Sequence, residues 1–425
     1  MTNYKKILNI ALPAMAENFL QMLMGVVDSY LVASLGLVAI SGVSVAGNII
    51  SIYQAIFIAL GVAVSSLISK SLGEGDRDNL AYHTSEAIKL TMLVSMFLGF
   101  LSLVFGRRIL AWLGTEPAVA NAGGLYLALI GGMILLLGLM TTLGSLIRAT
   151  SNPRMPMYVS FLSNLLNVLF SSLAIFIFHM GIVGVALGTI LARLVGVLIL
   201  WKELSLPLVP WSWKLDWDLL RLSLPAAGER LMMRAGDVVI IAIIVKFGTD
   251  AVAGNAIGEV LTQFNYMPGF GVATATVMLV AHAVGQADFQ AVRKLTKQTY
   301  WLSLGLMLPV ALLIFALGQP LIHLYTKDSS AVTASLSVIL FSLLGMPMTA
   351  GTVIYTAVWQ GLGNAKLPFY ATTIGMWLIR IVAGYFLGVT LGLGLSGVWS
   401  ATLLDNGFRW IFLQIIYQRK MRKIT

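Results

Sequence analysis

The feature that most constrains this chain is a series of long apolar segments that recur from one end to the other. Each is close to the ~20 residues that an α-helix needs to cross a bilayer. Backbone polar groups in lipid must bond to one another, so such segments fold as helices. With 58% hydrophobic and 10% charged residues, the chain is predicted to be an all-α integral membrane protein. The expected twelve transmembrane helices cover residues 8–33, 43–71, 80–105, 121–147, 156–178, 182–203, 218–246, 252–284, 294–318, 331–360, 367–389 and 394–417.

The basic residues indicate how the chain crosses the membrane. Loops on one side hold only Arg107, Arg108, Lys246 and Lys327, whereas the other loops and both termini hold most of the rest. Because Lys and Arg stay on the cytoplasmic side, both termini are expected in the cytoplasm, in a multi-pass protein of the plasma (inner) membrane. No cleavable signal peptide is expected, since the first apolar run is too long for one. The net charge of +10 then reflects topology, and no nucleic-acid partner is expected.

The two halves of the sequence repeat each other in a constant register, with a shift of 212. The matches at this shift are Pro13 with Pro225, Glu17 with Glu229, Gly36 with Gly248, Gly42 with Gly254, GEGD (73–76) with GQAD (285–288), and TSNPRMP (150–156) with LGNAKLP (362–368). Near the ends, GIVGVALGT (181–189) matches GLSGVWSAT (394–402) at a shift of 213. A register held through six spans indicates an internal duplication.

The duplication predicts two six-helix lobes. A shift over an even number of helices preserves their orientation, so a pseudo-two-fold axis along the membrane normal is expected to relate the lobes. Parallel repeats of this kind occur in secondary transporters, whose sites lie between the repeats. The expected domains are an N-terminal lobe (1–203), a cytoplasmic connector (204–217) and a C-terminal lobe (218–425). The Pro and Trp residues of the connector are typical of an interfacial strap.

Several motifs recur in a fixed order along the chain. Pro13 precedes Asp28 by fifteen residues in the first span, an LG turn follows at 35–36, and GEGD follows the second span. SNPRMP precedes the fifth span, which contains NLLNVLF, and most of these motifs have second copies. In these features the whole chain resembles the multidrug and toxic compound extrusion (MATE) family, within the wider MATE/lipid-flippase superfamily. The resemblance implies a monomer that exports organic cations in exchange for protons or sodium ions, with two lobes around a central cavity.

Asp28 is the main candidate for ion coupling. It lies in an apolar run with no Lys or Arg within a turn, and Glu17 and Gln21 share its helix face at ~100° per residue. An ionisable side chain within a span marks an ion pathway by default. A buried hydrogen-bond anchor is the alternative. The resemblance places the coupled ion at Asp28, beside Asn167.

The fifth span adds Asn164 and Ser171 to this candidate ion site. Many family members carry a second acid where this chain has Ser171. A sodium site requires several hard oxygen ligands. The missing carboxylate therefore favours a proton as the transported ion, with sodium as the alternative.

The second half carries different charges in its first span. Ile240 stands at the position that matches Asp28. The candidate substrate-binding residues are Glu229, Arg230, Arg234 and Asp237 of this span, together with Met24, Tyr53, Tyr266 and Trp359. Met adapts to varied ligands, and aromatic rings stack on cations.

A structural role is the alternative for many of these residues. The acids and arginines of the second half could form internal ion pairs that fix packing, as Asp405 and Arg409 could at i, i+4. Arg193 and Arg380 are further charges within spans. Most Met and aromatic residues could fill the core. Pro13 and Pro225 are expected hinges, because Pro removes a helix hydrogen bond.

Other function classes find little support in the sequence. There are no cysteines, and His83, His179, His282 and His323 stand singly, without a metalloprotease motif. No nucleotide-binding loop follows the glycine-rich turns. An enzyme, a metal site and a cofactor are therefore not expected. A flippase or exporter of a lipid-linked or anionic metabolite is the alternative function, because arginines could line a cationic cavity.

Overall fold

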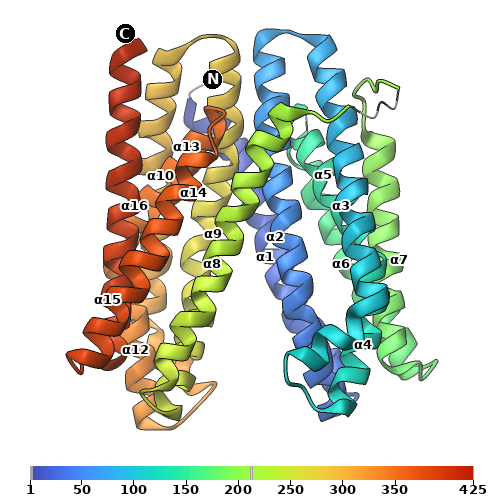
Figure 1. The fold of residues 1–425 in the computed structure, drawn as a ribbon, viewed down its shortest axis with the longest axis vertical. Helices are drawn as coiled ribbons and strands as arrows, with labels where there is room; N and C mark the ends of the chain where they lie inside the picture. The colour runs from blue at the N-terminus through green and yellow to red at the C-terminus, as the bar shows by residue number, and fades with distance from the viewer. Residues whose placement is uncertain (1–2, 151, 211, 213, 425) are drawn as a thin grey trace. The chain divides into compact units, whose positions relative to one another are not determined.

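The computed structural model describes residues 3–150, 152–210, 212 and 214–424. Regular structure within these ranges is helical throughout, which confirms the predicted all-α class. The first half of the chain contains α1 (Asn3–Ala33), α2 (Leu37–Glu74), α3 (Arg77–Trp112), α4 (Pro117–Gly132), α5 (Ile134–Thr150), α6 (Met155–Phe176) and α7 (Gly181–Glu203) (Figure 1).

The second half of the chain begins with α8. It contains α8 (Trp217–Val245), α9 (Thr249–Gly285), α10 (Phe289–Ala316), α11 (Gly318–His323), α12 (Ser329–Leu344), α13 (Met346–Gly361), α14 (Lys366–Thr373), the π-helix η1 (Ile374–Ile381), α15 (Val382–Tyr385), the π-helix η2 (Phe386–Thr390) and α16 (Gly394–Ile424).

The helices form two compact units. The N-terminal unit is Ala16–Leu220, and the C-terminal unit is Met1–Met15 together with Arg221–Thr425. Within each unit the long helices run side by side (Figure 1). In the C-terminal unit, the start of α1 and the end of α16 lie at the same end.

Ten transmembrane spans follow from length and hydropathy alone. Among the described residues, eight helices are long and apolar enough to cross a membrane, and the bent pairs α4–α5 and α12–α13 add two more spans. The long helices α8 and α16 are not among them, because they carry ionisable side chains within the span. With these two the structure has the twelve expected spans.

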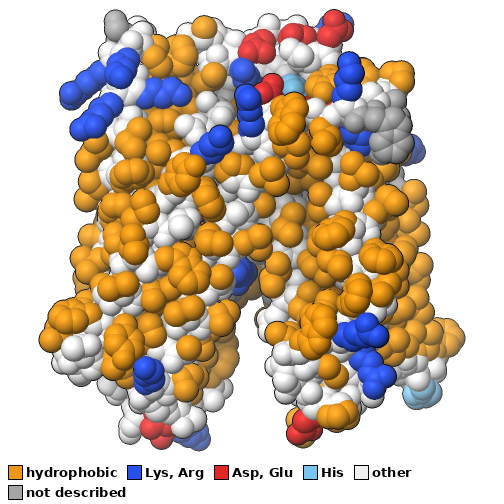
Figure 2. Space-filling model, viewed as in Figure 1, with side chains coloured by type: hydrophobic (Ala, Val, Ile, Leu, Met, Phe, Trp, Pro, Cys, Tyr) orange, Lys and Arg blue, Asp and Glu red, His pale blue; other side chains and the backbone are white. Residues whose placement is uncertain are grey.

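The surface has the pattern of a membrane protein. On the face shown in Figure 2, hydrophobic side chains cover most of the middle of each unit, and most Lys and Arg side chains lie near the helix ends.

The duplication is visible in the backbone. Gly36 and Gly248 precede α2 and α9 with φ values of 104° and 98°, a region that favours glycine. A Cβ at Gly42 would lie 3.0 Å from the carbonyl oxygen of Val119, and one at its match Gly254 would lie 2.8 Å from that of Ala331, the match of Val119. The halves therefore share turns and helix contacts as well as sequence.

The first turns of α1 pack in the C-terminal unit. Ile7 and Ala11 are fully buried in a hydrophobic cluster with Val272 of α9. A Cβ at Gly271 would lie 2.8 Å from the carbonyl oxygen of Ala11. Because of this contact, the boundaries of the two compact units differ from the boundaries of the two sequence repeats.

The connector is fastened to α3 within the N-terminal unit. Nζ of Lys89 is paired with Glu86 and donates to the carbonyl oxygens of Ser212 and Lys214, over 2.8 and 2.6 Å. His83 Nδ1 lies 2.6 Å from Asp216 Oδ2. Lys89 is 4% exposed, so the connector covers a buried charge.

Candidate functional site

A polar centre of the N-terminal unit surrounds Asp28 on α1. Nδ2 of Asn167 on α6 donates to Oδ1 of Asp28 over 3.0 Å, which confirms the expected contact. Oδ1 of Asn167 accepts from the hydroxyls of Ser171 and Thr189, over 3.2 and 3.0 Å. We call these four residues the N-terminal centre. Three helices meet in it, α1, α6 and α7.

Close packing of α6 on α7 holds Asn167 in place. A Cβ at Gly188 would lie 2.8 Å from the backbone nitrogen of Ser171, so only glycine lets the helices approach this closely. Ser163 on α6 donates to the carbonyl oxygen of Ala192 on α7, over 3.0 Å. Asn167 is 5% exposed as a result. Its amide is thus oriented before any ion or substrate arrives.

Two residues near Asp28 were not linked to it by the sequence. Arg193 lies one turn beyond Thr189 on α7, near enough for its charge to act on the Asp28 carboxylate. Thr189 was missed altogether. Its signal was the Thr that ends both copies of the repeat at 181–189 and 394–402.

Asn164 does not join the hydrogen bonds of the N-terminal centre. Its Nδ2 is buried and has no hydrogen-bond partner within the described part of the chain.

Glu17 of α1 contacts two other helices of the N-terminal unit, α5 and α6. It is paired with Arg148 of α5 and accepts a hydrogen bond from Ser160 of α6 over 3.3 Å. Glu17 therefore links α1 to α5 and α6.

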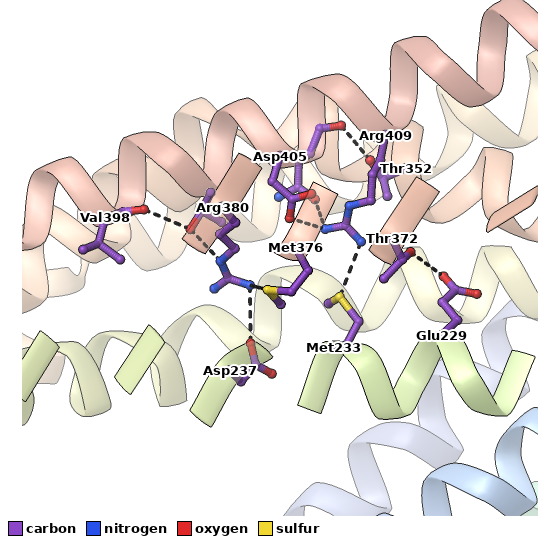
Figure 3. Close-up of polar contacts among 12 residues, drawn as sticks. Glu229, Met233, Asp237, Thr352, Thr372, Met376, Arg380, Val398, Asp405 and Arg409 are labelled. Atoms are coloured by element: carbon purple, nitrogen blue, oxygen red, sulfur yellow. Dashed lines mark hydrogen bonds and ion pairs between the residues drawn. The ribbon is translucent and has the colours of Figure 1, made fainter. Parts of the chain in front are cut away.

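The C-terminal unit holds a row of charged side chains (Figure 3). Arg409 donates to Asp405 over 2.7 Å, which confirms the expected i, i+4 pair. Asp237 is paired with Arg380 of η1 at 3.3 Å, rather than with the arginines of its own helix.

The other charged candidates on α8 lie near this row. Glu229 accepts from the Thr372 hydroxyl over 3.1 Å. Arg230 is partly buried close to Glu229, and Arg234 is exposed. All four candidates on α8 therefore belong to one charged region of the C-terminal unit.

The apolar candidates lie in different places. Met24 and Tyr53 are 9% and 6% exposed, and Ser102 donates to the Tyr53 hydroxyl over 3.1 Å. The Tyr266 hydroxyl lies 3.2 Å from that of Ser342.

Trp359 belongs to the core of the C-terminal unit. It is 2% exposed, and its Nε1 donates to the carbonyl oxygen of Leu413 over 3.1 Å. Pro13 and Pro225, the expected hinges, lie inside α1 and α8, which continue past them.

The described residues offer no metal centre. No group of three or more His, Asp or Glu side chains among them could hold a metal ion.

Two repeats of membrane helices, each with charges buried inside it, are an architecture typical of membrane transporters. The MatE family model matches residues 13–173 and again 225–386. The first residues of the two matches are 212 apart and the last are 213 apart, as in the sequence repeat. The chain therefore belongs to the MatE family of transporters, and it is not an enzyme.

Relatives cover almost the whole chain. A probable multidrug resistance protein NorM from Thermotoga maritima is 28% identical over 95% of this chain and 90% of its own length. The uncharacterized transporter YisQ from Bacillus subtilis is 24% identical over 97% of this chain and 93% of its own. A crystal structure of MATE in the bent conformation has a TM-score of 0.90 at 19% identity, over 99% of this chain and 96% of that one, and it shows the same fold.

Proposed function

We propose that this transporter is a cation-coupled multidrug efflux antiporter that exports lipophilic organic cations by alternating access. The observation that carries the proposal is the hydrogen bond from Asn167 to Asp28 inside the apolar N-terminal unit. The names of relatives such as the probable multidrug resistance protein NorM support the choice of substrate class.

Asp28 is the group that takes up the coupled ion. A buried carboxylate is costly to keep ionised, so proton uptake removes a large penalty. A gain of this kind is enough to favour one of two helix packings that differ by a similar free energy. Asn167 joins α1 to α6 through Asp28, and Pro13 gives α1 a place to bend.

The hydrogen bonds of Asn167 favour a proton over sodium as the coupled ion. Its Oδ1 already accepts from Ser171 and Thr189, and its Nδ2 faces Asp28. An amide oxygen has two lone pairs, and both are occupied while the two hydroxyls donate to it, although the Thr189 hydroxyl shares its one hydrogen with the carbonyl oxygen of Val185. Sodium would need these bonds to rearrange.

The charged region of α8 supplies the substrate contacts in this proposal. Glu229 attracts the cationic part of a drug. Arg380 and Arg409 are paired with acids, which weighs against an anionic or lipid-linked substrate. Asn164 remains a proposed member of the ion site by its place on α6, since its unpartnered Nδ2 is a hydrogen-bond donor and cannot itself bind a cation.

The proposed setting is the inner membrane, with a monomer whose termini are both cytoplasmic. The lobes are 1–203 and 218–425, joined by the connector. Reporter fusions at the C-terminus test the topology, and an external C-terminus would refute it.

Asp28→Asn tests the coupling role. In proteoliposomes with an imposed proton gradient and no sodium, the variant should bind ethidium but lose gradient-driven export. Ser29→Ala is the matched control, because the exposed Ser29 hydroxyl bonds only within α1, and it should export at the wild-type rate. Wild-type export by Asp28→Asn would overturn the proposal.

A further inference from the structure

The register of the duplication changes by one residue inside the second half. Up to Thr372 the shift is 212. A backbone contact of Gly184 with Ala174 recurs between Gly397 and Leu387, where the shift is 213. The second half thus has one extra residue between positions 372 and 387.

A π-helix absorbs this extra residue. Residues Ile374–Ile381 form η1, and a π-turn holds one more residue than an α-turn. At a shift of 213, Arg380 near the end of η1 takes the place of Asn167, and Thr402 takes that of Thr189.

The contacts of the two sites agree with this correspondence. Nε of Arg380 donates to Oγ1 of Thr402 over 3.1 Å, and its Nη1 donates to Oδ1 of Asp237 over 3.3 Å. Thr402 bonds to the carbonyl oxygen of Val398 one turn earlier, as Thr189 does to its own helix. Figure 3 shows Arg380 reaching from η1 to Asp237 on α8. Each unit therefore joins an acid of its first span to a threonine of its last span through one side chain.

The joining side chain differs in charge. Asn167 is neutral, and Arg193 acts on Asp28 through its charge without an ion pair to it among the described residues, so a mobile cation has room at Asp28. Arg380 carries a permanent charge on a longer side chain. Its acid, Asp237, stands three residues before Ile240, the match of Asp28, and the extra length spans that turn.

We propose that Arg380 is a tethered cation that fills, beside Asp237, the place that the transported cation takes beside Asp28. The C-terminal unit then takes up neither a proton nor sodium at Asp237, and coupling is confined to one unit. This inference rests on the proposed role of Asp28.

The surrounding charges leave Arg380 as the counter-ion of Asp237. The positive charges of Arg234 on α8 and Arg409 on α16 also act on Asp237. The negative charge of Asp405 acts on it in the opposite direction. Glu259 of α9 also acts on Arg380. Among the described residues, the ion pair of Asp237 is with Arg380. Asp237 keeps 41% of its side chain exposed, and Arg380 keeps 11%, so an ion could reach the acid if the guanidinium were absent.

Cation uptake by the purified full-length protein tests the inference. Proton uptake after a pH jump and binding of sodium-22 are measured in detergent. Asp28→Asn should lose the saturable uptake of the wild type. Asp28→Asn with Arg380→Asn should regain it, and adding Asp237→Asn should abolish it again. No gain in the double variant, with a monodisperse protein, would overturn the inference.

Two controls keep the test decisive. Arg380→Lys retains a tethered charge, so in the Asp28→Asn background it should show no gain. If Arg380→Asn does not fold, Asp28→Asn alone still decides, because residual uptake that Asp237→Asn removes would contradict the inference. Residual uptake that Asp237→Asn leaves unchanged would instead contradict the coupling role of Asp28.

Discussion

Glu17 and Glu229 occupy matching positions in the two halves and have different partners. Ser160 donates to Glu17 over 3.3 Å, and Thr372, the match of Ser160, donates to Glu229 over 3.1 Å. Among the residues that the structure describes, Glu17 also forms an ion pair, with Arg148 of α5, and Glu229 forms none. The hydroxyl contact is duplicated, and the ionic contact is not.

The starts of α3 and α10 differ in the same way. Asp76 and Asp288 both cap these helices with their side chains. Lys89 on α3 is buried under the connector, whereas its match on α10 is Trp301, which is 57% exposed. Duplication has preserved turns, caps and close helix contacts, while the charges have diverged. Functions that depend on backbone packing should therefore be shared by the two units, and functions that depend on charge should not.

The largest expected effect comes from the pair Asp405–Arg409, which the N-terminal half lacks. Asp405 is 0% exposed, so Arg409→Met would leave a buried charge without its partner, at a cost of about 3–5 kcal/mol. The double variant with Asp405→Asn should recover most of this loss. Thermal unfolding in detergent measures both. Lys70→Met, which breaks the exposed pair with Glu74, should cost about 0–1 kcal/mol. A cost this small for Arg409→Met would show that the pair is dispensable.

The next largest effect is the loss of stability on replacing matching glycines, and it should be equal in the two halves. Gly42→Ala and Gly254→Ala each push a Cβ against the backbone of a neighbouring helix, within 2.6 and 2.8 Å, and each should cost about 1–3 kcal/mol. Gly47→Ala is the control, since its Cβ would meet nothing within 4 Å and should not destabilise α2. Unequal losses in the free energy of unfolding for the two variants would contradict the claim that the two halves share the same backbone packing.

Much of the fold was readable from the sequence because hydropathy and the repeat act locally along the chain. The spans follow from the length of the apolar segments. The match of Gly36 with Gly248 follows because both positions need a positive φ, which favours glycine. The pair Asp405–Arg409 was also predictable, since both lie on one helix at i, i+4.

Contacts between helices were harder to predict. The partner of Asp237 is Arg380, 143 residues away, and a helical wheel offers only residues of its own helix. The shift from 212 to 213 was visible in the sequence, but the π-helix that absorbs it was not, because a one-residue insertion has no hydropathy signal. Asn167 beside Asp28 could be placed only through the family resemblance.

A smaller difference should separate the two glutamates. Thr372→Val removes the one hydrogen bond that Glu229 accepts among the described residues, and should cost about 1.5–3 kcal/mol. Ser160→Ala should cost about 1 kcal/mol or less, because Glu17 keeps Arg148. Unfolding of the two variants in parallel measures the difference. In an Arg148→Gln background the cost of Ser160→Ala should rise towards that of Thr372→Val, and no rise would argue against this account.

The smallest effect concerns the contact of the connector with α3, whereas the start of α10 is contacted by the end of α16. Burial opposes ionisation of Asp216, but hydrogen bonds from His83 and from the backbone amides of Leu219 and Asp218 hold its pKa below the usual value. A lowered pKa means that the folded state gains stability above the unfolded pKa of about 3.9. This gain disappears as the pH falls through the folded pKa.

Hydrogen exchange of the strap and the first turns of α3 should therefore stay slow near neutral pH and accelerate only in acid. Asp216→Asn should remove this acid-side dependence and cost about 0.5–1.5 kcal/mol at neutral pH, because the amide oxygen can still accept from the backbone while the charge beside His83 is lost. Asp218→Asn is the matched control, since Asp218 is exposed, and it should keep the dependence. The first turns of α10, which the end of α16 contacts through the bond from Arg293 to the carbonyl oxygen of Met421, give a comparison within the same molecule that lacks the Asp216 carboxylate. Equal acid sensitivity at the starts of α3 and α10 would show that the strap adds nothing to the N-terminal unit.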